Sequence, residues 1–591
     1  MQVSPICIPV FFGFSLIGFH LFLKNPSGNV HKEVGMVEPS TSSRLPSAVD
    51  RRADFGAFTK RQRASAQVAV STADSGIKDF FGKAEVGSKV RLFQNVRGVT
   101  PLEGEILMLH SLEDGSQTAR VIGQSTLPSG QLAKRSLFLA SSKAGYEGFI
   151  REIGSTYAWK FSSSQRTSDE LVFSQIPLDQ LICASISGGK VSEGMPADSN
   201  FDPPEVRATI DPRDLRGFDL EERSDLVMRG PSYALADEGS SERNPSSGYF
   251  IPKLSSKSWA KRVLYLDFDG HSLKGTVWNE DQSVIKVKSI VGEQVDADFI
   301  RRVWLKVSAA YAPFRVNVTT DSRVFAKAKP RERLRVLGSS NPRQIGESNI
   351  GGISYVGTFG QSFYQPSFFF VKSFTTSTNA GRVAIHESGH SMGLFHDGRS
   401  SSPSQEYYRS HGKSPRKWAS WMGHSSGADI TQWSRGQYYL ASNKEDDLSM
   451  LQSVLGSTSE GPSSLRKPIT LSLPGKRNGQ IISRDDFDFY VIKGGKGKNV
   501  KIRVSPRMGS RSLIPSLLLL DASGSRIPSR KFRWENGLTV VRSVTLPSNY
   551  VVAKVGGAGF GNPWKPKANG FPTGATDYGS IGPYRISVTL D

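Results

Sequence analysis

The sequence predicts a multi-domain protein: an α/β domain, with a mixed sheet and a helix that carries the site residues, flanked by an N-terminal β-rich domain and a C-terminal β-sandwich. The chain has 591 residues, enough for about three or four domains. Short apolar runs separated by glycine, serine and proline dominate both flanks, a pattern typical of strands and turns. Only the middle of the chain alternates strand-like and helix-like periodicity.

Net charge bears on the partners of the protein more than on its fold. The formal net charge is +21 and the isoelectric point is about 9.8. The basic residues are scattered and form no nucleic-acid module, so we expect no nucleic-acid partner. The charge indicates either an ordinary basic surface or attraction to an anionic surface or extracellular polymer.

The N-terminal segment 1–24 predicts export. Residues 6–23 form one apolar stretch without formal charge at the extreme terminus, which is typical of a signal peptide or of an uncleaved membrane anchor. We therefore expect a secreted, cell-surface or periplasmic protein, with the membrane as a partner only if the segment stays uncleaved. Residues 25–83 are polar and rich in serine, arginine and alanine, which predicts a flexible linker.

The two cysteines of the chain are Cys7 and Cys183. Removal of the N-terminal segment would leave Cys183 alone, so that no internal disulfide could form. We therefore expect packing and a metal ion, not disulfide bridges, to stabilise the domains.

Residues 84–186 predict the β-rich domain, because short apolar runs alternate there with glycine and serine clusters. Residues 187–259 are polar again, with prolines and serine clusters, and predict a second linker. The strands expected in the β-rich domain are 90–93, 104–109, 136–140, 157–161 and 170–173.

Residues 260–460 predict the α/β domain. Residues 298–311 have helical spacing of their apolar side chains. Residues 368–371 form a continuous apolar run, so we expect that strand to be buried on both faces. A second helix is predicted from a cap at Thr378-Asn379 to Met392. The other elements expected are strands at 263–268, 314–319, 334–337 and 353–356, and a closing helix at 432–438.

Residues 466–591 predict the β-sandwich, because short apolar-rich strands recur there at sandwich-like spacing. The strands expected are 469–473, 488–491, 500–504, 517–521, 550–555 and 584–588.

The second predicted helix carries the residues with the clearest chemistry. His386 and His390 are four positions apart, so both side chains lie on one face of the helix and can bind one zinc ion. Glu387 follows the first histidine, where its carboxylate can reach a water that the metal activates. Gly393 permits a sharp turn, and His396 can then return to the metal as the third ligand. One position of the metal stays open, as a catalytic site requires.

This pattern resembles the metzincin family of zinc peptidases, whose extended motif has the same histidine, glutamate and glycine spacing. The family also has a methionine turn beneath the metal, and Trp421-Met422-Gly423 matches it. Asp397 after the third histidine is similar to the adamalysin or reprolysin branch, and we expect it to anchor the turn by local hydrogen bonds. The opening strand, Leu264 to Gly270, resembles large bacterial secreted metallopeptidases.

The resemblance implies a secreted zinc endopeptidase with one catalytic zinc ion and a protein or peptide substrate. Glu387 would be the general base, and residues 353–356 would be the edge strand that pairs with an extended substrate. The loops around 398–432 would set cleavage preference. Asp267 and Asp269 raise the question of a calcium site, but two carboxylates are too few for one.

The C-terminal block resembles the bacterial pre-peptidase C-terminal domains, which are β-sandwiches attached to secreted peptidases. The resembling segments include Asp485–Tyr490 and Asp577–Tyr584. An alternative function follows from this likeness: a catalytically inactive cell-surface binding or adhesion protein that uses the sandwich. The intact Glu387 favours the enzyme, because a scaffold needs no base.

Cys183 is open to two interpretations. Residues 84–186 stand before the catalytic block, where a pro-domain would be expected, and a thiolate is a good zinc ligand. Cys183 would then fill the open position of the metal and keep a zymogen latent, as in the cysteine switch of some metzincins. Alternatively, it is a small hydrophobic residue in a strand, as its neighbours Leu181 and Ile182 suggest.

Overall fold

A computed structural model describes residues 68–186 and 250–591, apart from short gaps within these ranges. The predicted signal or anchor at 1–24, Cys7 and most of the two predicted linkers lie outside the described residues. The described part is multi-domain and mostly β-sheet, with few helices. Among its helices, none combines the length and the apolar character needed to cross a membrane.

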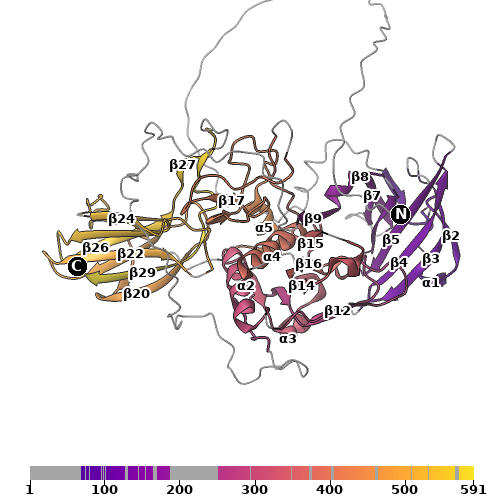
Figure 1. The fold of residues 1–591 in the computed structure, drawn as a ribbon, viewed down its shortest axis with the longest axis horizontal. Helices are drawn as coiled ribbons and strands as arrows, with labels where there is room; N and C mark the ends of the chain where they lie inside the picture. The colour runs from indigo at the N-terminus through magenta and orange to yellow at the C-terminus, as the bar shows by residue number, and fades with distance from the viewer. Residues whose placement is uncertain are drawn as a thin grey trace, which may run out of the picture. The chain divides into compact units, whose positions relative to one another are not determined.

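The N-terminal part is an eight-stranded antiparallel sheet in the order β1-β8-β7-β6-β5-β4-β3-β2 (Figure 1). It begins at β1 (Val68–Ser71), before the predicted boundary at residue 84, because β1 pairs with the distant strand β8. The other elements are α1 (Phe80–Lys83), β2 (Lys89–Leu92), β3 (Leu102–Ser111), β4 (Gln117–Thr126), β5 (Leu132–Ser142), β6 (Gly145–Glu152), β7 (Tyr157–Ser163) and β8 (Glu170–Pro177).

The central part is a six-stranded mixed sheet in the order β13-β10-β14-β16-β15-β9. The first four strands of this order are parallel, and β15 and β9 run antiparallel to their neighbours. The strands are β9 (Ile182–Ile186), β10 (Arg262–Asp267), β13 (Val316–Thr319), β14 (Arg333–Ser339), β15 (Ile350–Tyr355) and β16 (Ser367–Phe370). Strand β9 was expected to belong to the N-terminal domain. It leaves that sheet and becomes an edge of the central one.

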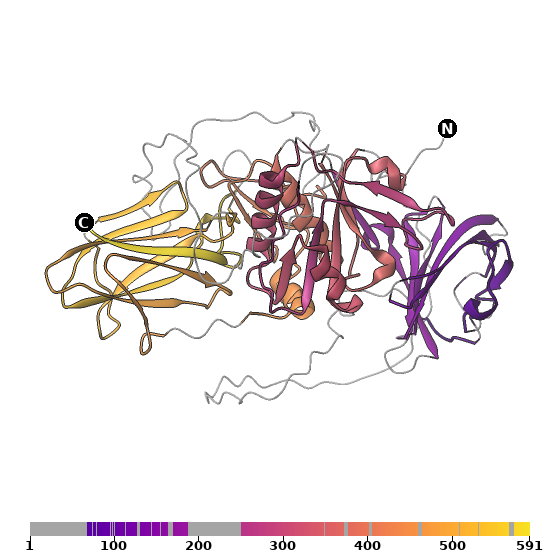
Figure 2. The same cartoon turned by 90° about the horizontal axis from the view of Figure 1, so that it is seen from below.

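Two long helices cover one face of the central sheet, α2 (Ala297–Ala310) and α4 (Ser377–Ser391) (Figures 1 and 2). Phe369 of β16 packs in the core on this side, whereas Phe368 and Phe370 pack in the core shared with the N-terminal sheet. This arrangement confirms that the strand is buried on both faces. The remaining elements are β11 (Gly270–Leu273), β12 (Ile285–Lys288), α3 (Ser322–Lys327), β17 (Trp418–Ser420), β18 (Ile430–Gln432) and α5 (Asp447–Leu455).

The central part begins before residue 260. Leu254 is buried in its core, and its backbone N–H donates to the hydroxyl of Thr320 at 2.9 Å. The predicted closing helix at 432–438 is wrong. Gly436 has a φ of 69° there, and the backbone N–H of Ser434 donates to Asp447, which holds an irregular segment against α5.

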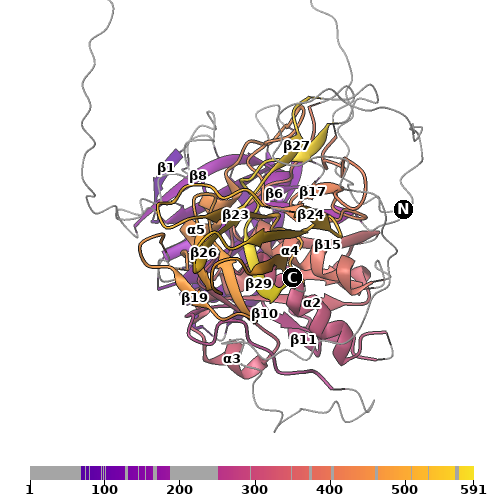
Figure 3. The same ribbon diagram turned by 90° about the vertical axis from the view of Figure 1, so that its left-hand side faces the viewer.

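The C-terminal part is a sandwich of a four-stranded sheet, β19-β21-β26-β23, and a five-stranded sheet, β20-β29-β22-β25-β24 (Figure 3). All six predicted strands are present, and five further strands, β20, β24, β25, β27 and β28, were not predicted. The bounds are β19 (Ile469–Leu471), β20 (Gly475–Ile481), β21 (Asp488–Lys493), β22 (Asn499–Pro506), β23 (Pro515–Leu520), β24 (Lys531–Glu535), β25 (Thr539–Thr545), β26 (Tyr550–Gly557), β27 (Phe560–Asn562), β28 (Thr573–Ala575) and β29 (Gly582–Leu590).

Both flanking parts pack tightly on the central one. Phe149 of the N-terminal sheet stacks near Tyr355 and Tyr364, with ring centroids 6.0 and 6.4 Å apart. On the other side, the side-chain amide of Gln480 donates to the carbonyl of Ala312 at 2.6 Å. The central part therefore shares an apolar core with each neighbour.

Candidate metal centre

Helix α4 positions the first two histidines. Its N-cap is Thr376, whose hydroxyl accepts a hydrogen bond from the backbone N–H of Asn379, so the cap lies two residues before the predicted one. The helix ends at Ser391 with Met392 as its C-cap, and Gly393 follows with a φ of 101°. That value lies in the region that glycine tolerates best, which confirms the predicted turn.

The three histidines of the motif converge. Nε2 of His390 lies 3.0 Å from Nε2 of His386 and 3.1 Å from Nε2 of His396. His386 and His390 are buried, and burial lowers the pKa of His386 to about 3 and that of His390 well below its ordinary value. Both rings are therefore neutral at physiological pH, and each carries one proton.

The position of that proton follows from the partners of the second ring nitrogen. Nδ1 of His386 lies 2.9 Å from the carbonyl of Trp421, and Nδ1 of His390 lies 2.7 Å from the carbonyl of Leu394. A carbonyl only accepts, so both Nδ1 atoms are donors and both Nε2 atoms carry lone pairs. The contact between these two Nε2 atoms is therefore not a hydrogen bond.

His396 completes the set. Its Nδ1 donates a hydrogen bond of 2.9 Å to the carboxylate of Glu406, and its Nε2 faces Nε2 of His390. The three Nε2 atoms are thus placed to donate lone pairs to one cation. Three imidazoles with one open position form a donor set of catalytic zinc sites. The residues present therefore fit a zinc ion.

Glu387 lies beside this set on α4 and is fully buried. It packs against β15 at Gly352: a Cβ atom added there would come within 2.6 Å of both Cγ and Oε1 of Glu387. The absence of a side chain at Gly352 therefore leaves the room that the carboxylate occupies.

Met422 is fully buried beneath the histidines. A Cβ atom added at Gly389 would lie 2.7 Å from its sulfur, so the methionine packs against α4 between the two helical ligands. The carbonyl of Met422 also accepts from the backbone N–H of Asp397 at 2.9 Å. Met422 therefore packs against the helix that carries His386 and His390.

Three carboxylates singled out in the sequence make local contacts. Burial raises the pKa of Asp397 to about 7, and its Oδ1 accepts from the hydroxyl of Tyr438 at 3.2 Å, consistent with an anchoring role. Asp267 forms an ion pair with Arg335, and Asp269 accepts from Tyr265 at 3.3 Å. These contacts give no support to calcium.

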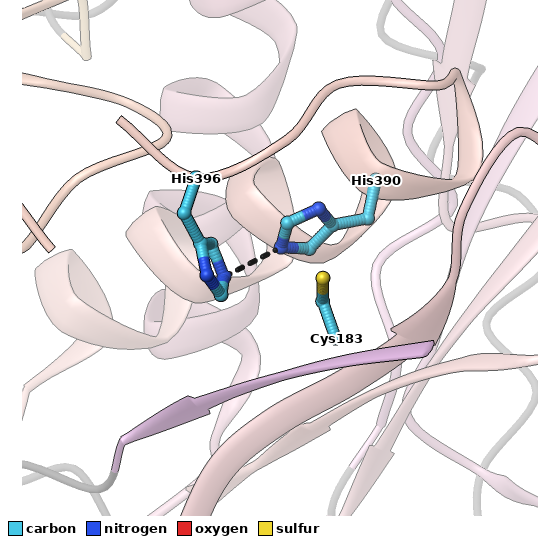
Figure 4. Close-up of side chains that lie close together, drawn as sticks. All are labelled: Cys183, His390 and His396. Carbon is cyan, nitrogen blue, oxygen red and sulfur yellow. Dashed lines mark hydrogen bonds between the residues drawn. The ribbon is translucent and has the colours of Figure 1, made fainter. Parts of the chain in front are cut away.

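Cys183 lies beside two histidines of the candidate metal centre. Strand β9 pairs antiparallel with β15, with Cys183 opposite Ser354. Figure 4 shows the thiol pointing from β9 toward the rings of His390 and His396, and the ligand atoms of these three residues lie within 4.8 Å of one another. The thiol is buried. The structure thus brings together a cysteine and the histidine motif from distant parts of the chain.

Two residues of the centre were not predicted from sequence. Glu406 orients His396, and the hydroxyl of Tyr407 donates to the carbonyl of Ala184 in β9 at 2.5 Å. The ring of Tyr407 packs on His396, with centroids 4.2 Å apart. Neither residue belongs to a local motif, so the sequence carries no signal that identifies them.

No protein-family model and no curated protein matches this chain. Among solved structures, the chain is similar to the pre-peptidase C-terminal domain of a collagenase from Bacillus anthracis, with 16% identity and a TM-score of 0.15, covering 22% of this chain and 99% of that chain. It is also similar to CorA, a surface-associated copper-binding protein important in copper acquisition by Methylomicrobium album BG8, with 11% identity and a TM-score of 0.14, covering 21% of this chain and 98% of that chain. Similarities this weak carry no argument about function.

Proposed function

We propose that this protein is an exported, latent zinc endopeptidase of the metzincin type. The observation that carries the proposal is that the Nε2 atoms of the three histidines lie together while each Nδ1 lies beside a hydrogen-bond acceptor. Such a set binds a metal, and the neighbouring Glu387 supplies a base.

The chemistry is hydrolysis of a peptide bond. A zinc ion held by His386, His390 and His396 would polarise the scissile carbonyl and lower the pKa of the attacking water to about 7. Glu387 accepts the proton of that water as its oxygen bonds to the carbonyl carbon. The carboxylic acid then returns the proton to the amide nitrogen as the carbon–nitrogen bond breaks, which gives a carboxylic acid and an amine.

The substrate is an extended peptide chain. Strand β15 offers its second edge next to the histidines, and such an edge binds a peptide by main-chain hydrogen bonds. In the described structure, β9 occupies this edge and runs antiparallel to β15. Residues 182–186 therefore block the place where a substrate strand would bind.

Latency follows from this placement. Cys183 lies close enough to His390 and His396 to act as a further metal ligand once its thiol is deprotonated. Its burial alone is also typical of a small hydrophobic residue, but the direction of the thiol toward two imidazoles favours coordination. We therefore propose that β9 and Cys183 together close the site.

The alternative is a catalytically inactive surface-binding protein. Burial of a carboxylate costs free energy unless the surroundings stabilise it. An inactive scaffold would gain nothing from Glu387 at this position, where Gly352 must also lack a side chain. These features favour the enzyme.

The test uses the full-length chain, because the central part shares its cores with both neighbours. We expect one zinc per chain by elemental analysis, and hydrolysis of casein once β9 is displaced. His396→Ala should lower the zinc content, whereas His271→Ala on β11 should retain it. Stoichiometric zinc in His396→Ala, or a metal-loaded chain that never hydrolyses peptides, would contradict the proposal.

A further inference from the structure

Strand β9 shows where the main-chain carbonyls of an extended strand lie when that strand pairs with β15. Ala184 follows Cys183, the residue whose thiol faces the histidines, and pairs with Ile353 of β15. Its carbonyl accepts a hydrogen bond of 2.5 Å from the hydroxyl of Tyr407. The strand is therefore held from two sides, by the main chain of β15 and by one side chain.

Tyr407 is fixed in this orientation. Its ring packs on the rings of His396 and His386, with centroids 4.2 and 6.2 Å away. The preceding residue, Glu406, is tied to Nδ1 of His396. These contacts hold the ring of Tyr407 against the histidines independently of its hydrogen bond to β9.

The next residue, Tyr408, points elsewhere. It is buried, its hydroxyl pairs with Nδ1 of His411 at 2.8 Å, and its ring packs on Tyr438 with centroids 4.1 Å apart. The two adjacent tyrosines thus make different contacts. Tyr407 contacts β9, whereas Tyr408 packs in the core. A substitution of Tyr408 is therefore a matched control for a substitution of Tyr407.

We propose that Tyr407 is a substrate-positioning residue of this enzyme. When β9 leaves, its hydroxyl donates to the main-chain carbonyl of the substrate residue that replaces Ala184. The contact recognises an extended peptide backbone and is independent of the substrate side chain, so it fixes the register of the peptide relative to the metal. This role rests on the proposed function, because β9 serves as the template for the substrate.

The first experiment follows β9 in the full-length chain by amide hydrogen exchange. Tyr407→Phe keeps the ring and removes the donor. Loss of one neutral hydrogen bond should speed exchange of residues 182–186 by about 3–10-fold. Tyr408→Phe should leave exchange of this strand unchanged. Equal exchange in the parent and in Tyr407→Phe would overturn the contact on which the proposal stands.

The second experiment measures peptide hydrolysis in a full-length Cys183→Ser background after β9 is displaced, so that the strand does not compete with the peptide for Tyr407. Tyr407→Phe should raise KM by about 3–10-fold and change kcat by less than about threefold, with zinc content retained. An unchanged KM, or a fall in kcat alone, would overturn the positioning role. Absence of hydrolysis in the Cys183→Ser parent would overturn the proposed function itself. The exchange experiment would still report whether Tyr407 holds the strand.

Discussion

Helix α4 and strand β9 both present side chains to the metal centre, but they depend on the rest of the chain to different degrees. The spacing of His386, His390 and His396 follows from one helix and one glycine turn. The contact between Tyr407 and Ala184 joins residues 223 positions apart. In the proposed function, the helix binds the metal and the strand controls access to it, so substitutions in one should leave the role of the other intact.

The largest effect is expected at the base. Glu387→Gln keeps the shape of the side chain and all three histidines, so the zinc content should stay the same. Turnover should fall by about 10²–10⁴-fold, the usual contribution of a general base. The measurement compares hydrolysis rates after β9 is displaced in both proteins. If the turnover of the variant stays within tenfold of that of the parent, Glu387 is not the general base.

The next largest effect on activity is expected for Cys183 in strand β9. Cys183→Ser should raise the activity of the full-length chain by about tenfold, which corresponds to weakening the closed state by about 1.4 kcal/mol. The thiol offers an independent measurement. In a Cys7→Ser background, labelling of Cys183 by a thiol reagent should accelerate when a chelator removes the metal. If the chelator does not change the labelling rate and Cys183→Ser does not change the activity, Cys183 has a packing role alone.

The third prediction concerns Gly352, where strand β15 packs against Glu387 of helix α4. A Cβ atom there would meet Glu387 at 2.6 Å and the carbonyl of Phe368 at 2.7 Å. Gly352→Ala should therefore lower stability by about 1–3 kcal/mol and reduce kcat by displacing the base. Gly292→Ala is the control, because nothing lies within 4 Å of the added atom. Equal unfolding free energies and equal kcat values in the two variants would refute this packing argument.

The smallest effect on stability is expected for substitution of Met422. Met422 acts through packing against Gly389, so Met422→Leu, which keeps the volume, should cost less than about 1.5 kcal/mol. Zinc content and the melting temperature check this expectation. Complete loss of zinc would show that the sulfur has a role beyond packing.

Much of the fold was readable from periodicity. The helix at 298–311 and the six expected sandwich strands are present close to their predicted bounds. The predictions of secondary structure were wrong where contacts with distant parts of the chain determine the conformation. Residues 68–71 are a strand because β8 pairs with them, and residues 432–438 are irregular because Asp447 and Gly436 hold them.

The sequence by itself determined the residues that we propose as metal ligands and base, because helix geometry and one glycine turn fix their relative positions over eleven residues. Only the tertiary structure decided which side chains surround them. Cys183 reaches the histidines because β9 crosses from one sheet to another, and Tyr407 meets Ala184 for the same reason. Strand pairing between distant segments depends on the packing of the whole chain, and no local pattern encodes it.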